Sequence, residues 1–151
     1  MTCDEVISEL KSLSSEKYKS NVVKMGIPEA SSIGVSTGDI RKLAKGIERS
    51  NEFAYELWRT GYHEAKLLAV LVFDKKLISL HDIKQLISEV SSWDLCDHLC
   101  KNLIIKLKGY QELIEIWCNS KETYIKRAAF TPMASALIHV NQYQRTLLIT
   151  I

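Results

Sequence analysis

The stretch Ala65-Lys-Leu-Leu-Ala-Val-Leu-Val-Phe73 decides the fold class of this chain. Read at helical period, its apolar side chains cover almost the full circumference of one helix. A helix of this kind must be covered on more than one side, since exposed apolar surface is unfavourable in water. The stretch therefore predicts an inner helix with other helices packed around it.

The segments before this stretch also have helical rather than strand period. Thr2 and Glu5 have the spacing of a capping box ahead of a first helix. A second helix is expected from Ser15 to Lys24, ending before Gly26 and Pro28, and 27–37 is expected to be a loop. Further helices are expected after a cap at Ser36 or Thr37, and from Asn51 to the turn at Gly61.

The segments after it continue the helical pattern to the last residue. Helices are expected at His81–Val90, from Trp93 to about Leu107, at Tyr110–Cys118, at Glu122–His139 with a bend at Pro132, and from Asn141 onward. Amphipathic helices that alternate with apolar ones are typical of stacked helix pairs. We therefore expect an all-α protein of stacked antiparallel helix pairs, an α-α superhelix, in one domain over 1–151.

Charge, cysteine content and hydropathy bear on the cellular compartment of the protein and leave its activity open. A net charge of +2 over 151 residues does not distinguish nucleic-acid binders from other proteins. Cys96 and Cys100 are one helical turn apart in an apolar stripe and no CxxC pair occurs, which indicates reduced thiols and a cytoplasmic protein. No run of about 18 apolar residues is present, so no membrane partner is expected.

The segment Ser92-Trp-Asp-Leu-Cys-Asp-His98 contains the first candidate site. Trp93 and Asp97 are four residues apart, so a helix carries both side chains on the same side, at the margin of the apolar stripe. An indole beside a carboxylate suits an open concave surface. The alternative is structural: Trp93 is a core residue and Asp97 pairs with Lys101.

Arg127, in Tyr124-Ile-Lys-Arg-Ala-Ala-Phe130, is the second candidate. Its guanidinium could anchor a phosphate through two parallel hydrogen bonds, or it could form an ion pair with Asp94 or Asp97.

The rest of the sequence indicates no further functional site. Glu64 lies in the first turn of the apolar helix, where a carboxylate suits the helix dipole. Cys96, His98 and Cys100 match no common zinc spacing, so no metal is expected. No nucleotide-binding or hydrolase fingerprint occurs either, and no cofactor is expected.

Taken together, five short blocks resemble the AlkD-like DNA alkylation repair family, the HEAT-repeat-like DNA glycosylases. In chain order they are Gly34-Val-Ser-Thr-Gly-Asp-Ile-Arg-Lys-Leu-Ala-Lys45, Glu56-Leu-Trp58, Tyr62-His-Glu-Ala-Lys-Leu-Leu-Ala69, Ser92-Trp-Asp-Leu-Cys-Asp97 and Tyr124-Ile-Lys-Arg-Ala-Ala129. The single Trp of the fourth block resembles a less characterised branch of the family. The family continues with a further helix pair bearing a Trp-x-Leu-Arg type motif, which this sequence lacks, so a C-terminal truncation is expected.

The resemblance implies HEAT-like or ARM-type repeats around a concave basic groove that holds alkylated duplex DNA. It also implies monofunctional excision of N3- and N7-alkylated purines without a cofactor. Asp97 would be the carboxylate beside the deoxyribose and Trp93 an aromatic wall. The DNA contacts would come from Arg41, Lys101, Lys126 and Arg127.

Three functions remain open at this point: an alkylpurine glycosylase, a non-catalytic DNA-binding module, and a helical-repeat scaffold that binds protein. The apolar tail at 146–151 indicates either that the chain is a fragment or that a partner or a second copy covers this surface, so a homodimer is a further expectation.

Overall fold

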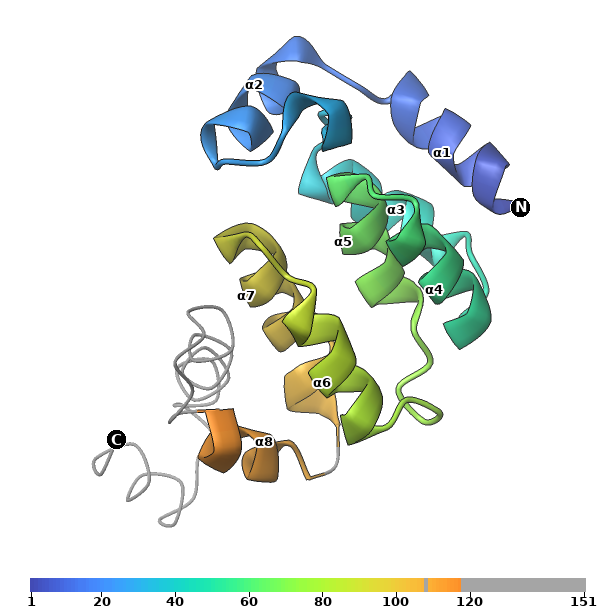
Figure 1. Ribbon diagram of the computed structural model, residues 1–151. Coiled ribbons are helices and arrows are strands. Elements are labelled where there is room, and N and C mark those ends of the chain that lie inside the picture. Colours follow the sequence, from blue (N-terminus) through green and yellow to red (C-terminus); the bar gives the residue numbers. More distant parts are fainter. Residues whose placement is uncertain (108, 118–151) are drawn as a thin grey trace. The chain divides into compact units, whose positions relative to one another are not determined.

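A computed structural model describes residues 1–107 and 109–117 of the chain. Within these residues every regular element is a helix, which confirms the predicted all-α class (Figure 1). The chain divides into two compact units, Met1–Ile78 and Ser79–Ile151, and each is described by itself.

The N-terminal unit contains five α-helices and one 3₁₀ turn among its described elements. They are α1 (Cys3–Ser12), α2 (Glu16–Lys24), the turn η1 (Glu29–Ser31), α3 (Thr37–Lys45), α4 (Asn51–Arg59) and α5 (His63–Val72). The first four helices each begin after a hydroxyl residue whose side chain accepts a hydrogen bond from a backbone N–H of the first turn. These caps are Thr2, Ser15, Ser36 and Ser50. The predicted helix starts are therefore confirmed to within a residue.

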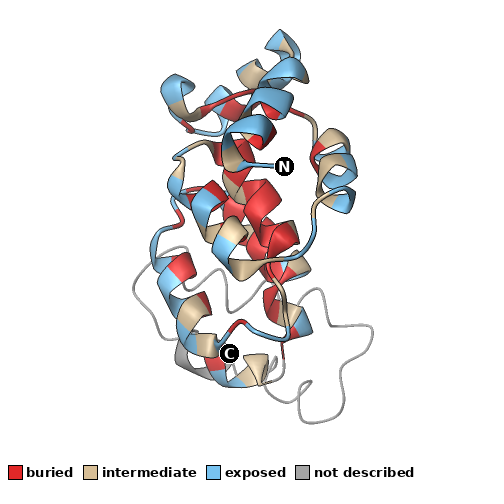
Figure 2. Ribbon diagram, turned by 90° about the vertical axis from the view of Figure 1, so that its right-hand side faces the viewer, coloured by how far each residue is buried: buried red, intermediate tan, exposed pale blue. Residues whose placement is uncertain are grey.

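The apolar stretch forms α5, which is the inner helix of this unit. Eight of its ten residues are buried, and it contacts α1, α3 and α4. Figure 2 shows the buried residues concentrated on inner helical segments of the chain. The turn between α4 and α5 passes through Gly61, whose φ of 85° is the left-handed region that favours glycine. An amphipathic helix followed by a wholly apolar one is the predicted pair, and α4 with α5 confirms it.

The C-terminal unit begins with α6 (Leu80–Ser88), which a turn at 89–92 joins to α7 (Trp93–Asn102). The turn η2 (Ile104–Lys106) and α8 (Tyr110–Trp117) follow. The prediction of one helix from Trp93 to about Leu107 is wrong, because α7 ends at Asn102. The 3₁₀ turn that replaces its last part carries buried Ile104, and Leu103 and Leu107 on either side of it are also buried. Packing of these three side chains outweighs continuation of the helix.

The helices expected at 122–139 and from residue 141 onward lie outside the described residues. Among the helices that the structure does describe, each is too short or too polar to cross a bilayer.

Candidate functional site

Helix α7 carries the first candidate site on its outward side. Ser92 fixes the start of the helix, since its hydroxyl accepts a 3.2 Å hydrogen bond from the backbone N–H of Leu95. Leu95, Cys96 and Leu99 face the core and are buried. Trp93 lies at the margin of this stripe, three residues before buried Cys96, and at this first position of the helix its side chain is 48% exposed. The alternative that Trp93 is a core residue is therefore wrong.

Three functional groups follow one another on that outward side, one helical turn apart. Trp93 is exposed, Asp97 is half-buried and Lys101 is exposed. Residues four apart on a helix are neighbours, so α7 presents an indole, a carboxylate and an ammonium group in a row. We call Trp93, Asp97 and Lys101 the α7 face. Such a row offers an aromatic surface and a negative charge to a cation, and a positive charge to a phosphate.

The buried polar residue of α7 has a structural role. His98 is buried, and the side-chain amide of Asn102 donates a 2.9 Å hydrogen bond to its backbone carbonyl. The same amide nitrogen lies 3.2 Å from His98 Nδ1. In the described part of the chain, no three His, Cys, Asp or Glu side chains are grouped in a way that would hold a metal ion.

The predicted DNA contacts fall on different parts of the chain. Arg41 lies on α3 in the N-terminal unit, where Arg41, Lys42 and Lys45 are all exposed while Ile40 is buried. One helix thus carries three cations on its outward side, which we call the α3 basic face. Lys126 and Arg127 lie outside the described residues, so the structure brings together only Trp93, Asp97 and Lys101.

Glu64 has a role that the sequence did not reveal. It lies in the first turn of α5 as predicted, and it is fully buried. Its carboxylate accepts hydrogen bonds from two successive backbone N–H groups, 2.9 Å from Ile33 and 2.8 Å from Gly34. A buried carboxylate needs such partners because burial of an unpaired charge is very unfavourable. The signal in the sequence was a carboxylate at the start of a helix that is apolar over most of its circumference.

The fold is shared with a solved structure described as "A new family of proteins related to the HEAT-like repeat DNA glycosylases with affinity for branched DNA structures". The two are 25% identical with a TM-score of 0.85, over 93% of this chain and 60% of the other. This chain therefore spans about 60% of the length of that relative. The class of protein defined by this fold is the HEAT-like helical-repeat protein.

The family follows from the sequence profile described as "DNA alkylation repair enzyme", which matches residues 6–150. Because the match covers nearly the whole chain, the protein belongs to the DNA alkylation repair family, as its five sequence blocks suggested. No curated protein matches the chain significantly.

Proposed function

We propose that this protein binds duplex DNA and excises N3- and N7-alkylated purines, with Asp97 as the carboxylate at the reacting sugar. The observation that carries the proposal is the α7 face, where a half-exposed Trp93 precedes a half-buried Asp97 by one helical turn. A core indole would not take this outward position. Membership of the DNA alkylation repair family supports the same substrate class.

An N3- or N7-alkylated purine already carries a positive charge, which makes its bond to the sugar labile. The protein therefore needs to supply only part of the stabilisation of the transition state. The bond between C1′ of the sugar and the purine nitrogen breaks, and its electron pair neutralises the departing base. The sugar then carries oxocarbenium-like charge, which a nearby carboxylate stabilises. Asp97 would supply that negative charge and accept a proton from the water whose oxygen bonds to C1′. The Trp93 indole would offer its negative face to the cationic lesion or sugar.

DNA affinity would come mainly from contacts with phosphates. Lys101 lies one turn beyond Asp97 and is exposed, and the α3 basic face adds Arg41, Lys42 and Lys45. Each cation that pairs with a phosphate releases counterions, so binding should weaken steeply as salt is raised. We include Lys126 and Arg127 among the expected contacts on the basis of the family resemblance alone.

The test is release of 7-methylguanine and 3-methyladenine from methylated duplex DNA by the full chain and by Asp97→Asn. If Asp97 acts only in the transition state, the variant should lose at least about 100-fold in release rate. Its affinity for the same duplex should stay within about threefold. Asp94→Asn is the matched control. Asp94 lies in the first turn of the same helix, and this substitution removes the same charge as Asp97→Asn. Equal release by Asp97→Asn and the parent would show that Asp97 is not the catalytic carboxylate.

A non-catalytic DNA-binding module is the second candidate. It is favoured by the description of the structural relative, a protein with affinity for branched DNA. It predicts no base release from the parent chain, together with salt-sensitive binding to duplex or branched DNA. Absence of any DNA binding would instead favour a protein-binding scaffold.

A further inference from the structure

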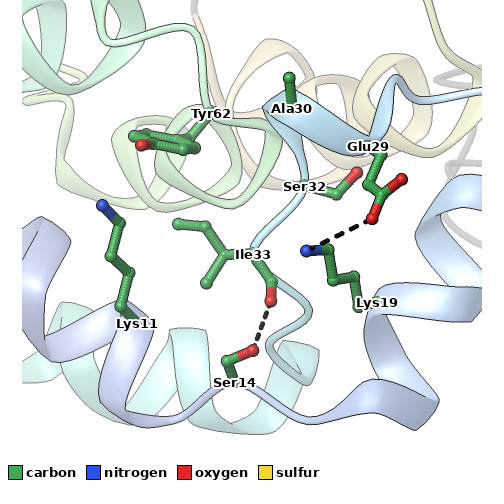
Figure 3. A pocket seen from close by; sticks show the side chains of 8 residues that line it. All are labelled: Lys11, Ser14, Lys19, Glu29, Ala30, Ser32, Ile33 and Tyr62. Carbon is green, nitrogen blue, oxygen red and sulfur yellow. Dashed lines mark hydrogen bonds and ion pairs between the residues drawn. The ribbon is translucent and has the colours of Figure 1, made fainter.

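The N-terminal unit contains a cleft of about 720 Å³ that no part of the proposed reaction uses (Figure 3). Its walls come from the end of α1, the start of α2, the loop around η1 and the turn before α5. The volume lies in the range of ordinary ligand sites, which is about 300–1,000 Å³. The cleft is therefore large enough to hold a ligand group rather than a single water molecule.

The charged groups of the cleft are two cations and one anion. Lys11 reaches it from α1 and Lys19 from α2, on either side of Ile33 in Figure 3, and Glu29 contributes the single carboxylate. The sum of these charges is +1. The hydroxyls of Ser14 and Ser32 already donate to backbone carbonyls, at 2.6 Å to Ile33 and 2.9 Å to Pro28. The lysine ammonium groups are therefore the charged donors of the cleft.

Each ammonium group of the cleft has one weak partner. Lys11 Nζ lies 5.2 Å from the centroid of the Tyr62 ring. Lys19 Nζ lies 3.9 Å from Glu29 Oε1, at the outer limit of an ion pair, and the Glu29 side chain is 80% exposed. Interactions of this kind are weak in water. An anion that binds either ammonium group would displace its partner at little cost.

The floor of the cleft is held in place by buried contacts. Glu64 binds the backbone N–H groups of Ile33 and Gly34, and the backbone N–H of Ser15 donates a 2.9 Å hydrogen bond to the Gly34 carbonyl. A Cβ atom at Gly34 would lie 2.6 Å from the Cβ of Lys19, so the two segments are in close backbone contact. The backbone of Lys19 is thus fixed relative to the floor, and a preorganised backbone loses less entropy when a ligand binds.

We propose that this cleft binds a phosphodiester group of a DNA strand, with Lys11 and Lys19 as its counter-charges. A phosphodiester carries one negative charge, which matches the net charge of the cleft. The cleft is open to solvent, since four of its lining residues are exposed: Lys11, Ser14, Glu29 and Ala30. A phosphate group within a longer DNA strand can therefore enter it. Small free ligands are usually enclosed over most of their surface, which this cleft does not provide. The proposal rests on the proposed function only in that the protein binds DNA.

The first test is an NMR titration of the ¹⁵N-labelled full chain with a short duplex. We expect shifts of the Ile33, Gly34 and Tyr62 amide signals, and loss of these shifts in the double variant Lys11→Gln/Lys19→Gln. The control Lys76→Gln/Lys84→Gln removes the same charge at two exposed lysines outside the cleft and should keep them. Inorganic phosphate at the same phosphate concentration should leave the three signals in place. Equal shifts with phosphate alone would mean a free-anion site and overturn the assignment to a DNA strand.

The second test is DNA affinity as a function of salt. Loss of one phosphate contact should lower the slope of log K against log salt by about one in Lys11→Gln/Lys19→Gln relative to its control. Glu29→Gln should raise affinity severalfold, because it removes the only carboxylate lining the cleft. Identical slopes for the cleft variant and the control would overturn the proposal.

The two proposals fail in different ways. Shifts at Trp93 and Asp97 without shifts at Gly34 and Tyr62 would overturn the cleft site and leave the proposed function standing. Shifts at the cleft alone would support the cleft site and count against the α7 face as the reacting site. A duplex that shifts neither set would overturn both.

Discussion

The carboxylate of Glu64 accepts a 2.8 Å hydrogen bond from the backbone N–H of Gly34, which lies 30 residues earlier in the chain. Its second oxygen accepts from the N–H of Ile33 at 2.9 Å. One buried side chain of the inner helix thereby satisfies two backbone donors of a buried loop, which have no helical partner. This contact ties the loop after η1 to α5 and so forms the base of the cleft.

Glu64→Gln should destabilise the protein by about 1 to 3 kcal/mol, because the amide has one acceptor oxygen for two N–H donors. The amide NH₂ group would face the second donor. Urea unfolding followed by circular dichroism measures the change. Glu48→Gln, which makes the same change at an exposed loop position, should alter the midpoint very little. Equal midpoints for the two variants would contradict the role given to Glu64.

Gly34→Ala should destabilise the protein more than Gly26→Ala. Both glycines have a φ near +90°, which is unfavourable for alanine by about 1 kcal/mol or more. An added Cβ at Gly26 meets no atom within 4 Å, whereas at Gly34 it would lie 2.6 Å from the backbone nitrogen of Lys19. The difference between the two unfolding midpoints therefore isolates the steric contact. If both variants lost the same stability, the close packing of Gly34 on α2 would be wrong.

Trp93→Ala should cost little stability, while Trp58→Ala should cost about 3 to 5 kcal/mol. The reason is burial: the Trp58 side chain is 3% exposed and that of Trp93 is 48% exposed. Under the proposed function, Trp93→Ala should nevertheless reduce base release from methylated DNA. Thermal unfolding and the release assay on the same samples separate the two effects. A large loss of stability in Trp93→Ala would show that Trp93 has a structural role.

Cys3 should react with iodoacetamide only at higher pH than a free cysteine does. Partial burial raises the pKa of its thiol above the ordinary value of 9.0, and the negative charges of Glu56 and Asp4 raise it further. The thiolate is the reactive form, so its fraction at any pH below the pKa is reduced. Mass spectrometry of the Cys3 peptide after timed labelling gives the rate at each pH.

Glu56→Gln should move the midpoint of this Cys3 profile to lower pH, since it removes one of the charges that disfavour the thiolate. The raised pKa of Cys3 also makes the stability of the folded protein depend on pH. The folded chain holds this proton more tightly than the unfolded chain, so stability falls as pH rises above about 9. An unchanged profile in Glu56→Gln would exclude this charge as a cause.

The sequence predicted the helices well because their signals are local. A hydroxyl residue before each of the first four helices and the period of the apolar side chains both act within three or four residues. The outward position of Asp97 beside Trp93 follows from the same period. The family blocks were readable for a related reason, since they are short runs of residues in chain order.

The sequence by itself therefore determined the helical class, the inner helix α5 and the residues that share the α7 face. Only the tertiary structure decided that α7 ends at Asn102, that Glu64 binds Ile33 and Gly34, and that Lys11 and Lys19 line one cleft. The physical reason is the separation along the chain between the residues that interact. A helix is specified by neighbours a few residues apart, whereas a buried carboxylate finds its partners, and lysines of two helices meet, only after packing brings distant segments together.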